Sequence, residues 1–409
     1  MSLQTALTGL TVAQTGIDTT SNNLANANTT AYKNQTALFE SIFPQEGAGD
    51  KVPGIGAEVE GITTNLTQGS LNQTGDSLDA GIQGNGYFVV ANNGVQQYTR
   101  DGAFQLDSTG QIETLNGGIV QGYTNNNGIL SSSLGAIQIN TGAIGATPTS
   151  DVGVTLNLNS GDTAPTNTTF DPTDSTSYNH ATSVVAYDSQ GNANHIQLYM
   201  VQATQAGSST QTWQVYAVPQ SSNGTMGTSS LLTTLSFNTS GALTSPTSPV
   251  TATVPWPNSS SSAPYTVKLD FTGTTAQAQT YAVSGLTNNG NPPGSYNGVT
   301  IGTDGSVEAN YTNGQTLTVG KIALATFLNP GNLTPITGNL YAANGNSGEA
   351  VIGQAGTGQA GTLAGGELEA SNVSTSNMLV ALIQYQQAYQ ANTSVIQTEQ
   401  QDSQRLLQI

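Results

Sequence analysis

The start of the chain carries a stripe of apolar and small side chains whose spacings alternate between three and four residues. That spacing is the period of one helix face, and no proline interrupts it. The stripe is narrow, as in the seam of a coiled coil, so we expect a terminal helix that packs against another helix. Its members are Leu3, Ala6, Leu10, Ala13, Ile17, Thr20 and Leu24.

The end of the chain carries a similar stripe within a segment rich in glutamine and alanine. Both residue types favour helix, so we expect a second helix that continues through the last residue. Ser374 and Ser376 are both suitable caps for its start. The members of the second stripe are Met378, Leu382, Tyr385, Tyr389 and Ile396.

Between these helices, short apolar alternations are bounded by glycine, asparagine, aspartate and proline, which is typical of β structure. The turn residues Asn92-Asn93-Gly94 between two such runs predict a hairpin. Further alternations predict half-buried strands of antiparallel sheets. Their inward-facing sets are Ile196, Leu198 and Met200, then Trp213, Val215 and Ala217, then Val267, Leu269 and Phe271.

Two stretches dense in serine, threonine, proline and glycine interrupt the alternation, around residues 140–180 and 239–265. Pro292-Pro293-Gly294 marks a further turn. These signals predict domain boundaries near residues 145 and 285, which would enclose a separate β domain.

The net charge of the chain limits the kinds of molecule that it can bind. The chain has six basic and 24 acidic residues, a net charge of −18, so nucleic acid and anionic membrane surfaces would repel it. Charged residues make up only 7% of the chain, against about 25% in ordinary soluble domains. Cysteine is absent, which excludes disulfides and thiolate metal sites.

The N-terminal segment lacks the basic and apolar regions of a secretory signal, because its first positive charge is Lys33. If the protein leaves the cell, we expect another export route. The apolar run from Met378 to Ile383 is too short to cross a bilayer, which takes about 20 residues. We therefore expect no membrane insertion.

A glycine motif near the C-terminal helix is a weak candidate for a cofactor site. Gly356, Gly358 and Gly361 match the spacing of a dinucleotide-binding loop, which needs a strand before it and a helix directly after it. The following Thr-Leu-Ala-Gly-Gly is a poor helix start, so a flexible connection is the favoured interpretation. We expect no cofactor.

The remaining candidate chemistry is equally weak. His180 and His195 are the only histidines, and neither has a partner at metal-ligand spacing. The aspartates of Asp107-Ser108-Thr109-Gly110 and Asp188-Ser189-Gln190-Gly191, like Asp304, fit turns and lack the rest of a calcium loop. No set of residues meets the requirements of an active site, so we expect a protein that is not an enzyme.

Each terminal helix has a stripe to bury, and the β regions offer it no companion helix. The two helices therefore pair with each other, with neighbouring subunits, or with both. Assembly is the favoured role, while a closed helical hairpin on a monomer stays open as the alternative.

Two motifs at the ends resemble the flagellar axial proteins, the rod and hook family. Residues 21–33 read SNNLANANTTAYK and include Asn22, Asn23, Ala25, Asn26, Tyr32 and Lys33. Residues 387–392 read QAYQAN and include Gln390, Ala391 and Asn392. One departure is Ala31, where the family pattern usually has glycine, so we expect a slightly different turn conformation there.

The resemblance extends inward on both sides. Residues 84–88, 98–102 and 311–315 carry it, as do Asn329-Pro330 and residues 366–373. Rod members run almost directly between these outer portions. This chain instead inserts well over a hundred residues, including 184–191, which resemble the outer β domain of hook members. The resemblance therefore points to the hook branch of the family.

The resemblance implies a nested, mainly β fold with α-helical termini that pair into an inner coiled-coil-like domain, and two antiparallel β domains outside it. Its expected parts are an assembly domain (1–32 and 370–409), a linker (33–70 and 350–369), an inner β domain (71–145 and 286–349) and an outer β domain (146–285).

The function implied is that of a structural hook subunit, which self-assembles into a flexible tube and transmits torque from rod to filament. The implied location is the hook of the bacterial flagellum, outside the cell. Implied partners are further copies, a hook cap protein, the distal rod protein, a hook–filament junction protein and the flagellar type III export apparatus. A distal rod subunit and a secreted β-sandwich adhesin are the alternatives.

Overall fold

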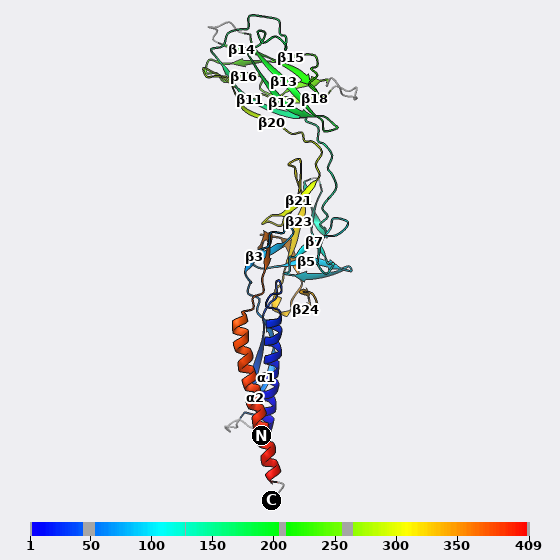
Figure 1. The fold of residues 1–409 in the computed structure, drawn as a ribbon, viewed down its shortest axis with the longest axis vertical. Helices are drawn as coiled ribbons and strands as arrows, with labels where there is room; N and C mark the ends of the chain where they lie inside the picture. Colours follow the sequence, from blue (N-terminus) through cyan, green and yellow to red (C-terminus); the bar gives the residue numbers. More distant parts are fainter. Residues whose placement is uncertain (1, 44–53, 127, 204–209, 256–264, 407–409) are drawn as a thin grey trace. The chain divides into compact units, whose positions relative to one another are not determined.

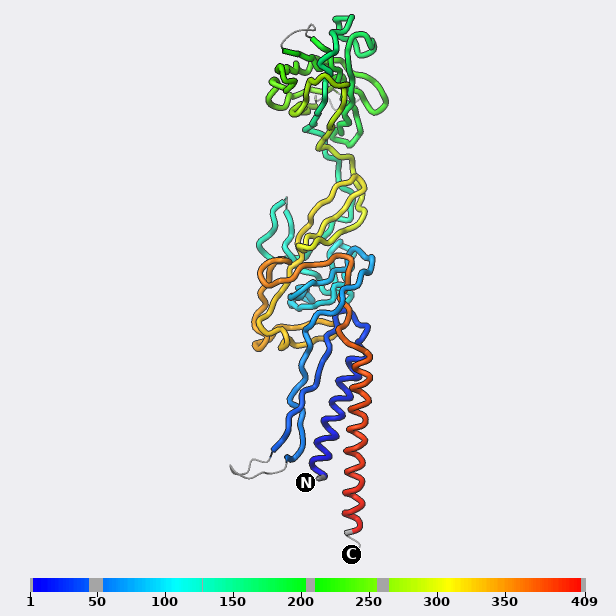
Figure 2. The backbone as a smooth tube through the Cα atoms, turned by 90° about the vertical axis from the view of Figure 1, so that its left-hand side faces the viewer, coloured from blue at the N-terminus to red at the C-terminus, as the bar shows by residue number. Residues whose placement is uncertain are grey.

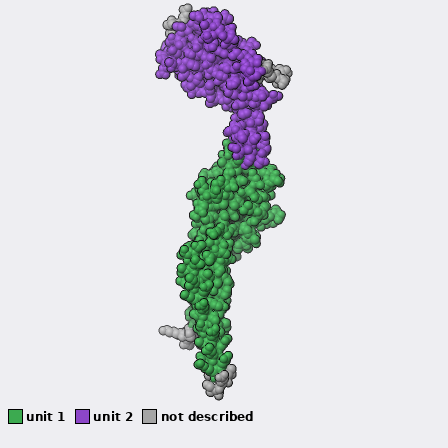
Figure 3. Space-filling model, in the orientation of Figure 1, with its two compact units in different colours: residues 1–140, 298–310, 316–409 green, residues 141–297, 311–315 purple. Residues whose placement is uncertain are grey.

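The computed structural model describes residues 2–43, 54–126, 128–203, 210–255 and 265–406. The chain divides into two compact units, coloured separately in Figure 3. Unit 1 comprises residues 1–140, 298–310 and 316–409, and unit 2 comprises residues 141–297 and 311–315. Unit 1 is thus built from both ends of the chain, with unit 2 inserted between them.

Two long helices lie side by side in unit 1: α1 (Ser2–Ala25) and α2 (Thr375–Leu406). They run in opposite directions, and α2 begins directly after Ser374. A hairpin of β1 (Gln35–Ile42) and β2 (Gly56–Thr64) lies along α1 (Figures 1 and 2). The predicted pairing of the terminal helices is confirmed.

The largest sheet of unit 1 has the strand order β21-β22-β23-β9-β5-β6-β25-β24, and β7, β8, β10 and β26 join it at its sides. Two small ladders, β27–β4 and β28–β3, lie outside it. The bounds are β3 (Leu71–Gln73), β4 (Ala80–Gln83), β5 (Tyr87–Asn92), β6 (Val95–Thr99), β7 (Phe104–Leu106), β8 (Ile112–Thr114), β9 (Ile119–Asn126), β10 (Ile129–Ala136), β21 (Tyr296–Ile301), β22 (Ser306–Tyr311), β23 (Thr316–Thr326), β24 (Thr334–Ile336), β25 (Leu340–Ala342), β26 (Val351–Gln354), β27 (Thr362–Gly365) and β28 (Glu367–Glu369), with the 3₁₀ turn η1 at Pro330–Asn332.

Strand β23 is central to this sheet because it pairs with β22, β9, β5 and β26 in turn. Its residues 322–325 are fully buried. The predicted hairpin at Asn92-Asn93-Gly94 is confirmed, since β5 and β6 pair antiparallel across it. Asn93 and Gly94 both have positive φ, as a tight hairpin turn requires.

Unit 2 packs two sheets around one apolar core. One sheet has the order β12-β13-β14-β15-β16, and the other has the order β17-β18-β11-β19, with β20 also paired to β11. The bounds are β11 (Asp151–Asn159), β12 (His180–Tyr187), β13 (Ala193–Gln202), β14 (Gln211–Gln220), β15 (Ser230–Phe237), β16 (Leu243–Ser245), β17 (Val250–Val254), β18 (Tyr265–Asp270), β19 (Thr275–Gln277) and β20 (Ala282–Asn288).

The three predicted inward-facing sets all lie in this core. The sets from β13 and β14 face alternate residues of β11, such as Val154 and Leu156, across the two sheets, while the third set lies in the same sheet as β11. The mainly β fold with paired terminal helices is therefore as predicted. One difference is that β11 pairs parallel with β18 and with β19, over short ladders, whereas we expected antiparallel pairing throughout. Apolar alternation reports which face is buried and does not report strand direction.

Candidate functional site

The seam between α1 and α2 is built on small side chains of α1. A β-carbon placed on Gly9 would lie 2.8 Å from Asn392 Nδ2, and one placed on Gly16 would lie 2.6 Å from the Tyr385 ring. One heptad further, Asn23 Nδ2 contacts Met378 Sδ at 3.7 Å. Each heptad forward on α1 thus matches a heptad backward on α2, which fixes an antiparallel register.

The predicted stripe of α1 coincides with this seam only in part. Ala6, Ala13 and Thr20 are buried, and Leu10, Ile17 and Leu24 are half-buried. Leu3, at the start of the stripe, is exposed. The two glycines were missed, because a residue without a side chain leaves no mark in a hydrophobic pattern. Their own heptad spacing is the signal that would have found them.

The predicted stripe of α2 faces α1, but only half-buried. Met378, Leu382, Tyr385, Tyr389 and Ile396 are each of intermediate exposure. Among residues 375–405, whose side chains the structure describes, none is buried. Of the QAYQAN motif, Asn392 reaches the seam, whereas Gln390 and Ala391 are exposed. A single subunit therefore leaves much of α2 in contact with solvent.

The N-terminal family motif ties the end of α1 to the start of β1. Asn23 is buried, and its side chain donates to Gln35 O at 2.6 Å and accepts from Gln35 N at 2.9 Å. Tyr32 Oη lies 3.1 Å from Asn23 Oδ1 and 3.2 Å from Asn22 Oδ1. Asn26 Nδ2 donates to Asn22 Oδ1 at 2.9 Å. These side chains hold the reversal after the helix, while Ala25 is exposed.

Ala31 has a φ of +57°, in the left-handed region that favours glycine. Its N–H donates to Glu369 O at 2.7 Å, so the turn is held in place from the other end of the chain. Ala31 therefore adopts the left-handed backbone conformation that a glycine would adopt at this position.

A buried ion cluster joins both helix ends to the β sheet, and it was not predicted. Lys33 Nζ lies 2.6 Å from Glu369 Oε1, and Arg100 Nε lies 2.9 Å from Glu369 Oε2. The Glu369 side chain is fully buried, and the two cations are nearly so. Lys33 follows α1, Arg100 follows β6, and Glu369 ends β28 shortly before α2. One carboxylate therefore holds three distant chain segments together.

Hydrogen bonds complete the cluster. Lys33 Nζ also donates to Thr67 O at 2.9 Å, Arg100 Nη2 donates to Gly84 O at 2.7 Å, and Gly69 N donates to Glu369 Oε1 at 2.9 Å. Burial lowers the pKa of the Lys33 ammonium, and the hydrogen bond to Glu369 opposes that shift without cancelling it. With two cations and one carboxylate, the cluster depends on Glu369 for most of its charge compensation.

A second asparagine closes the junction. Asn372 Oδ1 accepts from Asn34 N at 2.7 Å, and Asn372 Nδ2 donates to Asn65 O and Thr67 O, both at 2.9 Å. The segment before α2 is thereby bonded to the segments on either side of the β1–β2 hairpin. Asn372 Nδ2 also lies 3.2 Å from Thr67 Oγ1, so the side chain is fully engaged in holding these segments together.

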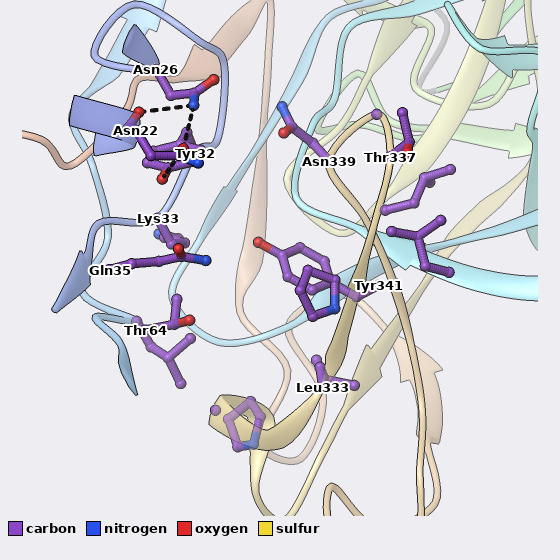
Figure 4. A pocket seen from close by; sticks show the side chains of 17 residues that line it. Asn22, Asn26, Tyr32, Lys33, Gln35, Thr64, Leu333, Thr337, Asn339 and Tyr341 are labelled. Carbon is purple, nitrogen blue, oxygen red and sulfur yellow. Dashed lines mark hydrogen bonds between the residues drawn. The ribbon is translucent and has the colours of Figure 1, made fainter. Parts of the chain in front are cut away.

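A pocket of about 380 Å³ lies beside this junction. Figure 4 shows Asn22, Asn26, Tyr32 and Lys33 on one side of it, and Asn339 and Tyr341 on the other. Burial raises the pKa of Tyr341 and holds its phenol neutral. The lining also contains threonine hydroxyls, amides and aliphatic side chains, and the Lys33 ammonium beside it is already paired with Glu369.

The other candidates for chemistry serve local structure. Gly356 and Gly358 have positive φ in the connection between β26 and β27, and no helix follows them there. His180 Nε2 lies 2.5 Å from Asp162 Oδ2, and the His180 ring stacks on the Tyr281 ring. His195 Nδ1 contacts Ser183 Oγ at 3.2 Å.

The turn aspartates accept from backbone N–H groups of their own turns, as Asp107 does from Thr109 and Gln111, both at 2.8 Å. Within the described ranges, no three histidine or acidic side chains are grouped to hold a metal ion. No helix of the described chain is long and apolar enough to cross a membrane.

Four family models match the chain in order. Residues 3–33 match "Flagella basal body rod protein", and residues 81–155 match "Flagellar hook protein FlgE/F/G D1 domain". Residues 157–291 match "Flagellar basal body protein FlaE D2 domain", and residues 364–409 match "Flagellar basal body rod FlgEFG protein C-terminal". The matches cover both ends and the inserted unit.

Relatives match along the whole length. The flagellar hook protein FlgE of Escherichia coli K12 is 36% identical over 408 residues, which covers 98% of each chain. FlgE of Brucella suis is 29% identical over 402 residues, covering 97% of this chain and 95% of the relative. The crystal structure of Helicobacter pylori hook protein FlgE2 is 16% identical, with a TM-score of 0.52 over 73% of this chain and 99% of that one, and it supports the fold. With hook proteins as full-length relatives, this chain belongs to the flagellar hook protein family and is a structural subunit of the hook.

Proposed function

We propose that copies of the chain polymerise through their paired terminal helices into a flexible tube that transmits torque from rod to filament. The observation that carries the proposal is the exposure of α2, which has no buried side chain among residues 375–405. A helix of 32 residues with a half-buried face gains little from its own subunit, so further burial must come from neighbouring copies.

A bending joint needs subunits that are rigid near its axis and free to slide outside it. The ion cluster at Glu369 and the Asn23 bonds supply stiffness where the helices join the β structure. The described part of unit 2 has one histidine–carboxylate contact, between His180 and Asp162, and no lysine or arginine ion pair, and it is neutral and polar at most positions. Contacts between such surfaces are weak and nearly equivalent in several positions, which permits sliding.

The proposed division of labour assigns residues 1–32 and 370–409 to assembly and residues 146–285 to the outer surface. Proposed partners are further copies, a hook cap protein, the distal rod protein, a junction protein and the flagellar type III export apparatus. The proposed location is outside the cell, and the role is structural, without catalysis or a cofactor.

The test removes residues 1–32 and 370–409 from the same chain. The trimmed protein keeps Lys33, Arg100 and Glu369, so its ion cluster stays intact. We expect a soluble, β-rich monomer at every concentration in sedimentation, while the full chain forms filaments visible by electron microscopy. We also expect the circular dichroism of the full chain to gain helical signal on assembly.

The control is a chain with Lys321→Ala, which removes a partly exposed ion pair with Asp304 in unit 1 and leaves the helices untouched. It should polymerise like the unmodified chain. Filaments formed by the trimmed protein, or full helicity in the free monomer, would contradict the role proposed for the termini.

A further inference from the structure

The paired helices expose large apolar side chains in two separate patches. The α1-start patch comprises Leu3, Leu7 and Val395, with exposed fractions of 43%, 50% and 42%. The α2-start patch comprises Leu379, Val380 and Ile383, with exposed fractions of 49%, 56% and 53%. These six are the exposed large hydrophobic residues on the described parts of α1 and α2.

The seam register places the patches at opposite ends of the helix pair. Because Asn392 lies at Gly9, Val395 is level with Ala6, between Leu3 and Leu7. In the same register Ile383 is level with Asp18. At a rise of about 1.5 Å per residue, the patch centres are about 20 Å apart along the axis. The helix surface between them exposes no large apolar side chain in the described residues.

The six side chains of the two patches carry no charge, in a chain whose net charge is −18. A partner surface bearing carboxylates or ammonium groups would lose hydration on covering them. An uncharged apolar surface of similar size has no such cost, and each patch is such a surface for the other. The uncharged, apolar character of both patches therefore favours a second copy of this chain as the occupant.

We propose that the α1-start patch of one copy packs on the α2-start patch of the next copy along the tube. The inference rests on polymerisation as proposed above and adds which residues meet. Two different patches that meet head to tail form an open polymer, since each copy leaves one patch free at either end. A patch that met its own counterpart would form a closed dimer and stop there.

The first test is charge complementation. Leu7→Glu alone and Ile383→Lys alone each place one charge in the contact, so each should raise the critical concentration for filaments at least tenfold. The double variant places the charges opposite each other in every contact, and an equimolar mixture of the two single variants does so in every second contact when the two alternate. Both should return the critical concentration to within about threefold of the unmodified chain at low salt, with the effect weakening as salt is added.

The second test uses the absence of cysteine from the chain. In the variant with both Leu7→Cys and Ile383→Cys, the two sites of one copy are about 16 Å apart along the helix pair. A disulfide needs Cα atoms within about 7 Å, so a bond within one copy is excluded. Mild oxidation of filaments should give a ladder of covalent multimers, and each single-cysteine variant should give none.

The outcomes separate this proposal from the proposed function. Filaments formed normally by both single charge variants, or failure of the double variant to recover, would overturn the patch pairing while leaving polymerisation intact. Covalent dimers from Leu7→Cys alone would show that the patch meets its own counterpart, which also overturns it. Failure of the unmodified chain to polymerise at all would remove both proposals. Cooperative melting of the β structure in each free variant, matched to the unmodified chain, excludes misfolding of the β units as the cause.

Discussion

The ring of Tyr385 lies against Gly16 across the helix seam, so close that a β-carbon on Gly16 would come within 2.6 Å of it. In an open helix position, changing glycine to alanine stabilises by about 0.5–1 kcal/mol. Here we expect Gly16→Ala to destabilise the helix pair by about 1–3 kcal/mol, because the ring or the helix must move. The melting temperature of the helical circular dichroism signal in assembled filaments measures the effect.

Two variants control for this interpretation. Tyr385→Ala in the Gly16→Ala background removes the clash and should recover part of the loss. Thr11→Ala, at an exposed position of α1, should be neutral or slightly stabilising. Stabilisation by Gly16→Ala would show that the helices do not approach each other as closely as described.

Glu369→Gln should be strongly destabilising, because it leaves Lys33 and Arg100 buried without their counter-charge. Breaking a buried ion pair from one side costs about 3–5 kcal/mol. Denaturant unfolding of the trimmed monomer, which retains the cluster, measures the loss. Asp304→Asn breaks the more exposed pair with Lys321 and should cost no more than about 1 kcal/mol. Equal losses in the two variants would argue against a special role for the cluster.

Ala31→Gly should stabilise unit 1. Alanine in the left-handed region costs about 1–2 kcal/mol, and glycine avoids that cost but loses about 0.5–1 kcal/mol more entropy on folding. We expect a net gain of about 0.5 kcal/mol in the free energy of unfolding. Ala37→Gly, in strand β1 where φ is ordinary, should instead destabilise. A loss at both positions would show that Ala31 is not strained.

Acid should weaken unit 2 partly through Asp188. Partial burial alone would raise the pKa of Asp188, but hydrogen bonds from Asn192, Gln190 and Asn194 together lower it. A carboxyl whose pKa is lowered in the folded state contributes stability at pH values above its unfolded pKa of about 3.9. That stability is lost as the pH falls through the folded pKa. The melting temperature of unit 2 should therefore decrease as the pH is lowered below about 4.

Asp188→Asn should remove this part of the acid sensitivity, since the amide cannot titrate. Its melting temperature should lie below that of the unmodified chain at pH 7 and approach it at pH 2. Asp402→Asn, at an exposed position of α2, serves as the matched control and should leave the pH profile of unit 2 unchanged. A constant difference between the Asp188 variant and the unmodified chain at all pH values would contradict the linkage.

Unit 2 should be removable without unfolding unit 1. Thr147 and Asn291 exchange two backbone hydrogen bonds of 2.9 Å, so a two-residue Asn-Gly turn can join them after deletion of residues 148–290. The core cluster of the sandwich lies entirely within the deleted segment. We expect cooperative melting of the remaining β structure, followed by circular dichroism. Its loss would argue against a nested arrangement of independent domains.

Sequence patterns predicted the elements better than their connections. Ile196, Leu198 and Met200 alternate because one sheet face is buried, and that signal is local. The ion cluster joins residues 33, 100 and 369, and no local pattern reports such distant partners. One indication of the cluster was present in the sequence: Lys33 and Arg100, two of only six basic residues, both lie within segments that resemble the family. Leu3 is similarly ambiguous, since an apolar stripe does not tell whether its partner belongs to the same copy.

The antiparallel seam also sets an order in time. Asn23 and Met378, which touch across it, are separated by 355 positions in the chain. A chain that is made from its N-terminus therefore presents α1 long before α2. During that interval α1 has nothing to close against, and a single helix of its length is marginal in water. The seam can close only after α2 has been made, so a fragment that stops short of α2 leaves α1 without its partner helix.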